Sequence, residues 1–234
     1  MQTIGLLGGM SWESTVTYYR LINEGVKGQL GGLHSANIIL HSVDFQPIES
    51  CQHKGDWVQT AEILKKAALS VQAGGADFLL ICTNTMHKVA DDIESVLEIP
   101  ILHIADATAE VLVSNGIKRA GLLGTQFTME QDFYKGRLAD RFGLEVIIPE
   151  KDDRQLVHDV IYTELCLGDV RAASKNEYLR IVNQLVDQGA EAVILGCTEI
   201  GLLLQQSDTP IRLFDTTVIH AEKAVSYSLS EFES

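Results

Sequence analysis

Short apolar runs alternate with longer amphipathic stretches along this chain. The run at 37–40 is typical of a buried strand, whereas the stretches 57–72 and 176–188 have the apolar spacing of helices. Strands that alternate with helices predict parallel sheets covered by helices. The expected fold class is therefore α/β, with parallel sheets.

One part of this pattern occurs twice. Residues 75–83 (GADFLLICT) and 189–197 (GAEAVILGC) both open with Gly-Ala-acid, continue through an apolar stretch and end in small residues. The two copies are 114 positions apart (189 − 75 = 114), so Thr83 corresponds to Cys197. The repeat predicts two strands of the same kind that end in different chemical groups.

Two further echoes keep the same order. Residues 4–8 (IGLLG) resemble 120–124 (AGLLG), with an offset of 121 − 5 = 116, and 99–102 resemble 209–213, with an offset of 210 − 100 = 110. Three echoes at nearly constant offset predict two pseudo-symmetric α/β domains. We expect residues 1–105 plus 211–234 in the first domain and 106–210 in the second, with the return near Pro210.

A helix should follow each copy of the glycine-ended strand. Ser11 is the expected N-cap of the first helix, with Glu13 in its first turn. Thr128 and Gln131 have the spacing of a capping box at the start of the second.

The polar residues that follow the predicted strands mark a candidate site, because ligands of open α/β sheets bind beyond the carboxyl ends of the strands. They fall in four short segments: 8–11 (GGMS), 83–85 (TNT), 124–125 (GT) and 197–199 (CTE). If the strand ends of the two domains face each other, Thr83 and Cys197 lie on opposite walls of a cleft between the domains. The active site is expected in that cleft.

Cys197 is the strongest candidate for chemistry. A free cysteine is commonly a small buried hydrophobe, but Thr198 and Glu199 are too polar to continue a core strand. The N-terminus of a following helix would lower the pKa of the thiol and favour the reactive thiolate. Cys82, one residue before Thr83, should point to the opposite face and pack in the core.

Composition narrows the classes of partner. The chain has 234 residues with a formal net charge of −14, which argues against nucleic acid or an anionic membrane as a main partner. Its four cysteines form no C-x-x-C pair, which favours a reducing compartment. No signal peptide and no apolar run of membrane-spanning length is evident, so we expect a cytoplasmic location.

Motifs for cofactors and metals are not evident either. Residues 5–9 match neither the dinucleotide fingerprint nor the P-loop. His87, His103 and His220 have no familiar metal-site spacing, so we expect them to have structural or hydrogen-bonding roles. The sequence therefore predicts no metal and no cofactor.

Three segments resemble the cofactor-independent aspartate/glutamate racemase family: 4–15 (IGLLGGMSWEST), 84–87 (NTMH) and 196–199 (GCTE). The resemblance covers nearly the whole chain and is closest to the enterobacterial branch that acts on L-aspartate and L-glutamate. It implies two α/β domains, a C-terminal helix that packs back on the first domain, and a homodimer. It also implies proton transfer by two cysteines on opposite faces of the substrate α-carbon, without pyridoxal phosphate or metal.

This chain departs from that family pattern at one catalytic position. Thr83 stands where the family carries the first cysteine, so the resemblance assigns the two catalytic roles to Thr83 and Cys197. Cys166 stands where relatives often carry a lysine, which removes one contact with the substrate carboxylate. The candidate substrate-binding residues are Met10, Gln52, Asn84, Thr85, Thr198 and Glu199.

Each binding candidate has an expected role. Asn84, Thr85 and Thr198, with backbone amides near Met10, would donate to the α-carboxylate as charge develops on it. Glu199 would hold the substrate ammonium, and Gln52 would reach the side-chain carboxylate.

The predicted function is racemisation of L-aspartate, L-glutamate or both. A threonine hydroxyl is a far weaker acid than a thiol, so Thr83 can donate or relay a proton but can hardly act as the resting base. In the family that the chain resembles, the second cysteine serves the L-enantiomer, so we expect the L-enantiomers to be handled better than the D-enantiomers. Two alternatives remain at this point, a single-thiol decarboxylase of a malonate-type acid and a non-catalytic amino-acid-binding protein.

Overall fold

The computed structural model describes residues 1–230 and divides them into two compact units. The first unit is Met1–Ile104 with the described residues from His220 onward, and the second is Ala105–Ile219. The return to the first unit comes nine residues later than the expected Pro210 (219 − 210 = 9). The reason is that Arg212–Asp215 forms a strand of the second sheet.

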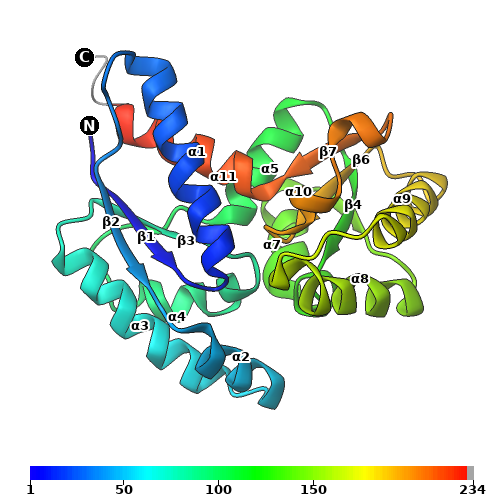
Figure 1. Ribbon diagram of the computed structural model, residues 1–234, viewed down its shortest axis with the longest axis horizontal. Helices are drawn as coiled ribbons and strands as arrows, with labels where there is room; N and C mark the ends of the chain where they lie inside the picture. Colours follow the sequence, from blue (N-terminus) through cyan, green and yellow to red (C-terminus); the bar gives the residue numbers. More distant parts are fainter. Residues whose placement is uncertain (231–234) are drawn as a thin grey trace. The chain divides into compact units, whose positions relative to one another are not determined.

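The first unit contains a parallel sheet with the order β2-β1-β3 (Figure 1). Its strands are β1 (Ile4–Gly8), β2 (Ile38–Ser42) and β3 (Phe78–Ile81). Its helices are α1 (Trp12–Leu30), α2 (Phe45–Lys54), α3 (Trp57–Ala73), the 3₁₀ helix η1 (Thr85–Val89), α4 (Ala90–Glu94) and most of α11 (Thr216–Leu229).

Alternate residues of β3 enter two different apolar clusters. Phe78 and Leu80 pack with α1 and α11, whereas Leu79 and Ile81 pack with α3 and α4. Sheets that are covered on both faces have continuous apolar strands, which explains the unbroken run in the sequence. Cys82 joins the first cluster, so its predicted packing role is confirmed, and α11 packs on the first unit as expected.

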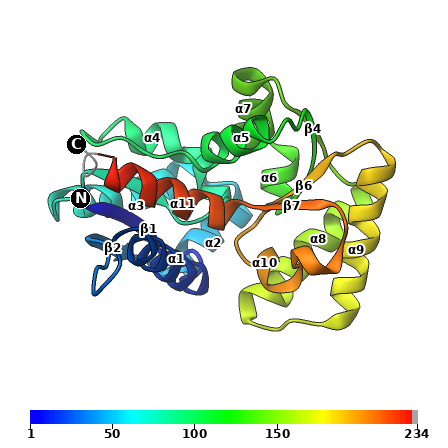
Figure 2. The same cartoon turned by 90° about the horizontal axis from the view of Figure 1, so that it is seen from above.

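The second unit contains a parallel sheet with the order β5-β4-β6-β7. Its strands are β4 (Arg119–Gly124), β5 (Glu145–Ile147), β6 (Ala192–Gly196) and β7 (Arg212–Asp215). Figure 2 shows around them α5 (Ile104–Ser114), α6 (Gln126–Glu130), α7 (Asp132–Phe142), α8 (Lys151–Thr163), α9 (Ala172–Asp187) and α10 (Ile200–Leu203). Two short 3₁₀ turns, Leu165–Leu167 and Gln206–Asp208, complete the unit. The α/β class with parallel sheets is confirmed.

The sequence repeat is also a structural repeat. In the first unit Gly5 pairs with Leu79, and in the second Gly121 pairs with Val193, so residues at the predicted offsets occupy the same register. The 99–102 echo is displaced, however. Leu79 bridges Ile101 whereas Val193 pairs with Leu213, an offset of 213 − 101 = 112 instead of the expected 110.

The acidic residue of each repeat has the same function. Asp77 Oδ2 accepts a hydrogen bond from Thr3 N at 2.6 Å, at the start of β1. Glu191 Oε2 accepts from Lys118 N at 2.7 Å and Arg119 N at 3.1 Å, at the start of β4. Each carboxylate thus binds the free amides where the central strand begins, which explains the Gly-Ala-acid motif.

One of the two predicted helix caps is wrong. Ser11 caps α1 as expected, since its side chain accepts from Ser14 N at 3.3 Å. The second helix starts earlier than expected, because Thr125 directly follows β4 in an extended conformation and accepts from Thr128 N at 3.3 Å. Thr128 therefore lies inside α6, and α7 begins separately after Gln131.

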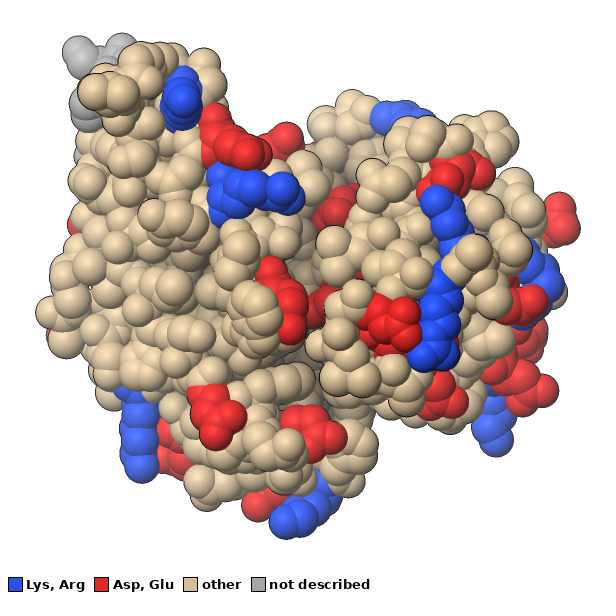
Figure 3. All heavy atoms as spheres, in the orientation of Figure 1, with Lys and Arg blue, Asp and Glu red and all other residues tan. Residues whose placement is uncertain are grey.

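On the face drawn in Figure 3, lysines and arginines stand among aspartates and glutamates, and the described residues of that face form no broad basic patch. In the same part of the chain, none of the helices combines the length and apolar character that a bilayer crossing requires.

Candidate active site

The first candidate turn, residues 83–85, follows β3 and is held by neighbouring elements. Cys82 N donates to Leu7 O at 3.0 Å, and Ser14 Oγ donates to Cys82 O at 3.0 Å. The end of β1 and the first turn of α1 thus fix the residue that precedes Thr83. Thr83 itself is half-buried and its N–H donates to Ile81 O at 2.8 Å. Asn84 and Thr85 are buried at the start of η1.

The ring of His87 forms hydrogen bonds that stabilise this turn. Its Nδ1 lies 2.8 Å from Thr83 O, and its Nε2 accepts from Ile104 N at 3.2 Å. Burial lowers the pKa of His87 well below its ordinary value, and His103 and His220 lower it further. Its hydrogen-bonding role was predicted, but its direct bond to Thr83 was not. The signal in the sequence was its position four residues after Thr83, which a helical turn brings back to the Thr83 carbonyl.

Met10 and Gln52 also belong to the first unit. Met10 is buried just beyond the end of β1. Gly9 before it has φ +95°, and a Cβ there would collide with the carbonyl oxygen of Val43, so the backbone approaches closely at this point.

Gln52 is buried on α2, with 3% of its surface exposed. Its Oε1 has no hydrogen-bond partner within the described part of the chain. A buried, unsatisfied acceptor is costly, and a ligand that donates a hydrogen bond would remove that cost. The expected role of Gln52 in binding the side-chain carboxylate of the substrate stays a prediction.

The second candidate turn, residues 197–199, follows β6. Cys197 Sγ donates to Glu199 Oε2 at 3.0 Å, and Thr198 Oγ1 donates to the same oxygen at 2.6 Å. Glu199 is 3% exposed. One carboxylate oxygen of the buried Glu199 therefore accepts hydrogen bonds from both residues that precede it, so the three predicted residues of this turn lie together.

The pKa of Cys197 is raised well above its ordinary value, contrary to our expectation. Burial is the largest cause, followed by the negative charge of Glu199 and the nearby Cys166. The Glu199 backbone N–H opposes the shift but is outweighed. The helix that was expected to stabilise a thiolate, α10, has four residues and begins three positions further on, so its dipole is small. The shift favours the protonated thiol, although Cys197 is only half-buried.

Other groups near Cys197 are distant in sequence and were not predicted. Tyr178 has its pKa raised by burial and then by Cys197, Glu164 and Cys166. Asp215 accepts from Thr217 N at 2.8 Å and Val218 N at 3.3 Å, and its pKa is raised first by burial and also by Glu199. The environment of the 197–199 turn is therefore electronegative, which favours a cationic group of a ligand.

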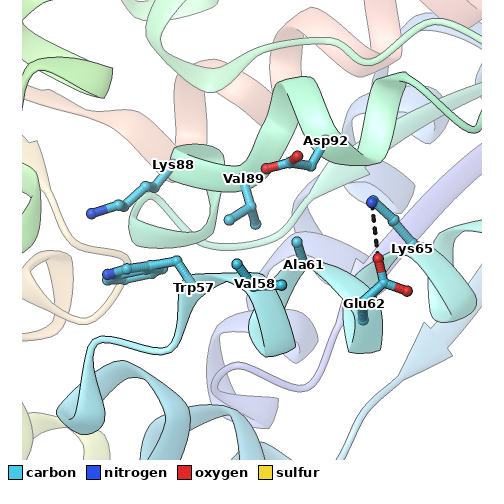
Figure 4. A pocket seen from close by; sticks show the side chains of 8 residues that line it. All are labelled: Trp57, Val58, Ala61, Glu62, Lys65, Lys88, Val89 and Asp92. Atoms are coloured by element: carbon cyan, nitrogen blue, oxygen red, sulfur yellow. Dashed lines mark hydrogen bonds and ion pairs between the residues drawn. The ribbon is translucent and has the colours of Figure 1, made fainter.

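Further cavities lie on the first unit. One of about 250 Å³ lies between α3 and the η1–α4 segment, where the Lys88 ammonium lies 4.2 Å from the centre of the Trp57 ring and Lys65 pairs with Glu62 at 3.0 Å (Figure 4). Another, of about 450 Å³, adjoins β2, α2 and α3 and includes Lys66. Within residues 1–230, no cluster of three or more His, Cys, Asp or Glu side chains is arranged to hold a metal ion.

Comparison with known proteins identifies this type of fold. A crystal structure from Yersinia pestis, provisionally assigned as an Asp/Glu racemase, is 55% identical, covers 98% of this chain and 100% of its own, and superposes with a TM-score of 0.92. An aspartate racemase homologue from Pyrococcus horikoshii OT3 is 32% identical, with coverages of 97% and 99% and a TM-score of 0.84. The broad specificity amino-acid racemase RacX of Bacillus subtilis is 27% identical over 176 residues, which are 71% of this chain and 73% of RacX.

The fold is that of the two-domain racemases, and the class of protein is an isomerase. The model of the Asp/Glu/Hydantoin racemase family matches residues 7–224, and the chain belongs to this family. The racemase interpretation is therefore favoured over the decarboxylase and the non-catalytic binding protein.

Proposed function

We propose that this protein racemises L-aspartate, L-glutamate or both without a cofactor, with one catalytic group from each unit. The observation that carries the proposal is the structural repeat itself. Thr83 and Cys197 follow equivalent strands, β3 and β6, at equivalent positions. Cys197 removes the α-proton of the L-enantiomer, and Thr83 supplies a proton to the opposite face of the α-carbon.

The protonated thiol needs a way to become a base. Substrate binding provides one, because an ammonium group beside Glu199 places positive charge near Cys197 and offsets the charge that raises its pKa. The Sγ proton, which is hydrogen-bonded to Glu199 at 3.0 Å in the free protein, then passes to water, and Thr83 later takes one proton back from water so that the cycle closes. The substrate thus activates its own base, and the free enzyme keeps a less reactive thiol.

The proton balance follows from these positions. The Cys197 thiolate takes the α-proton and becomes a thiol, and the electron pair of the C–H bond spreads into the substrate carboxylate. Hydrogen-bond donors around that carboxylate stabilise the developing charge. Asn84, Thr85 and Thr198 are the side-chain donors, and backbone amides near Met10 add to them. Thr83 then protonates the carbanion and regains its proton from water, so that it acts as a relay.

The two enantiomers should react with different kinetic constants, because Cys197 and Thr83 differ in acidity. Reaction from the D-enantiomer requires Thr83 to abstract a proton, and a threonine hydroxyl is a much weaker acid than a thiol. The equilibrium between enantiomers stays near unity. The asymmetry therefore lies in the separate values of kcat and KM for the two directions, and their Haldane ratio is unaffected.

The names of the relatives support an acidic amino acid as substrate, since two of them are described through aspartate or glutamate. The broad specificity of RacX leaves the range of accepted side chains open. We also propose a cytoplasmic location, because four unpaired cysteines are typical of a reducing compartment, and a homodimeric assembly.

The experiment that tests this proposal compares three variants in a chiral assay of aspartate and glutamate. Cys197→Ser should lower turnover of the L-enantiomers by about 10³-fold or more, because the base is lost. Cys51→Ser, at another partly exposed cysteine, is the matched control and should keep full activity. Thr83→Cys should raise turnover of the D-enantiomers. Full L-turnover in Cys197→Ser would refute the proposal.

A further inference from the structure

We propose that His87 is the positioning residue for Thr83, a role that rests on the proposed function. Its ring bonds the Thr83 carbonyl through Nδ1 at 2.8 Å and the backbone of Ile104 through Nε2 at 3.2 Å. In the proposed function it touches neither the reacting atoms nor the substrate. It acts through the backbone that carries the Thr83 side chain.

The two hydrogen bonds determine the tautomer of His87. A backbone N–H only donates, so Nε2 must be the acceptor from Ile104 and the proton must be on Nδ1. Nδ1–H can then donate to Thr83 O. In a protonated ring Nε2 would also carry a hydrogen and could not accept from Ile104 N. The two hydrogen bonds of the ring therefore require its neutral form.

The surroundings of His87 hold it in this form. His220 Nε2 faces Leu102 O at 2.7 Å and must donate, so its Nδ1 accepts from Tyr18 OH at 2.8 Å. The rings of His103 and His220 lie 4.5 and 5.9 Å from the His87 ring. All three histidines are buried, and a charge on any of them would disfavour a charge on the others.

The bond to Ile104 gives His87 a second attachment. Ile104 N is the first amide of α5, where helical N–H groups have no partner in the helix, and His87 Nε2 supplies one. Ile104 is also the last residue of the first unit before the chain enters the second. His87 therefore ties the Thr83 turn to the start of α5.

Positioning matters here because Thr83 must meet a short-lived carbanion. The Thr83 carbonyl belongs to the peptide plane that joins Thr83 to Asn84, so fixing it limits the orientation of both residues. A displacement of about 1 Å at a reacting group can cost about 10²-fold in rate. Loss of the hydrogen bond from His87 Nδ1–H to Thr83 O should therefore weaken protonation by Thr83. It should leave proton abstraction by Cys197 unchanged.

Two substitutions of His87 each keep one of the two hydrogen bonds of its ring and remove the other. An asparagine amide reaches the place of Nδ1–H, whereas a glutamine amide reaches the place of Nε2. His87→Asn therefore keeps the bond to Thr83 O, and His87→Gln keeps the contact with Ile104. His220→Gln is the matched control, because its ring belongs to the same histidine cluster and bonds Leu102 instead of Thr83.

The measurement uses L-aspartate in deuterated water and compares two rates for each variant. Formation of D-aspartate needs Thr83, whereas deuterium in recovered L-aspartate needs only Cys197. His87→Gln should lower the ratio of the first rate to the second by about tenfold or more. His87→Asn and His220→Gln should keep the wild-type ratio, even if they lower the midpoint of thermal unfolding.

An unchanged ratio in His87→Gln, or an equal fall in all three variants, would overturn the inference. Absence of both rates in the wild type would instead refute the proposed function. If His87→Gln does not fold, nitrogen NMR of the wild-type histidine rings decides. A neutral, Nδ1-protonated His87 supports the positioning role, and an Nε2-protonated or charged ring overturns it.

Discussion

At the scale of single residues, the side chains of Cys197 and Glu199 form a hydrogen-bonded pair at the end of β6. The thiol donates to the carboxylate at 3.0 Å, and burial together with the charge of Glu199 raises the pKa of the thiol. A reactive cysteine usually has a lowered pKa. In the proposed function, the thiol therefore becomes a base only when the substrate ammonium binds beside Glu199.

Removal of the Glu199 charge should lower the pKa of Cys197. In Glu199→Gln the carboxylate charge is lost while a hydrogen-bond acceptor remains, so we expect the pKa of Cys197 to fall. The thiolate absorbance in the ultraviolet, measured against pH and corrected with Cys197→Ser, gives this value. Glu222→Gln, an exposed acidic position on α11, is the control and should leave the titration unchanged. A higher pKa in Glu199→Gln would contradict the electrostatic argument.

The raised pKa also sets the direction of a pH effect on stability. The native state holds the Cys197 proton more tightly than the unfolded state does. The resulting stabilisation is complete below the unfolded pKa of about 8.5 and is lost as pH rises above it. Wild-type protein should therefore lose more thermal stability between neutral and alkaline pH than Cys197→Ser. Parallel losses in the two proteins would count against a raised pKa.

At the scale of the elements, the repeated Gly-Ala-acid segment explains why the sequence revealed so much of the fold. The glycine takes φ +98° in both copies, and the acid binds amides at the start of the neighbouring strand. The glycine conformation is local, and the hydrogen bonds of the acid span 74 and 73 positions in the two copies, so similar residues occupy equivalent places in both units. The cap of α6 was missed because Thr125 and Thr128 are both competent caps and only the end of β4 decides between them.

Loss of the Glu191 carboxylate should weaken the start of β4. Bonds from the backbone of Lys118 and Arg119 lower the pKa of Glu191. Its stabilising effect is therefore present above the unfolded pKa of a glutamate and is lost as pH falls through the lowered native pKa. Glu191→Gln should lower the midpoint of thermal unfolding by a few degrees at pH 7, with a smaller difference in acid. Glu24→Gln, at an exposed position of α1, should show no such pH-dependent difference.

At the scale of the whole molecule, the chain leaves the first unit at Ile104 and returns at His220. The two-unit build was predictable, because each unit repeats one pattern of strand and helix. The point of return was not, because β7 is short, only partly buried and starts with the exposed Arg212, so its sequence is a weak strand signal. The raised pKa of Cys197 was equally hidden, because its largest cause is burial, which the sequence does not show, and Cys166, a smaller cause, lies 197 − 166 = 31 positions away in the chain.

The returning helix α11 should be essential to the first unit. Leu229 is 5% exposed and packs with α1 and the first sheet. Leu229→Ala should therefore destabilise the protein by about 2–5 kcal/mol, by loss of buried surface and creation of a cavity. Leu69→Ala is the matched control, since Leu69 is 40% exposed on α3, and its cost should stay near 0.5 kcal/mol. Equal costs in denaturant unfolding would contradict the packing of α11 on this unit.

The central claim is that one thiol and one hydroxyl serve the two faces of a substrate α-carbon. Its most direct test is the initial rate of α-proton exchange of L-aspartate and of D-aspartate with wild-type protein in deuterated water. The two-group site predicts that the L-enantiomer exchanges much faster than the D-enantiomer, because only Cys197 can act as the base. Equal rates for the two enantiomers would contradict it.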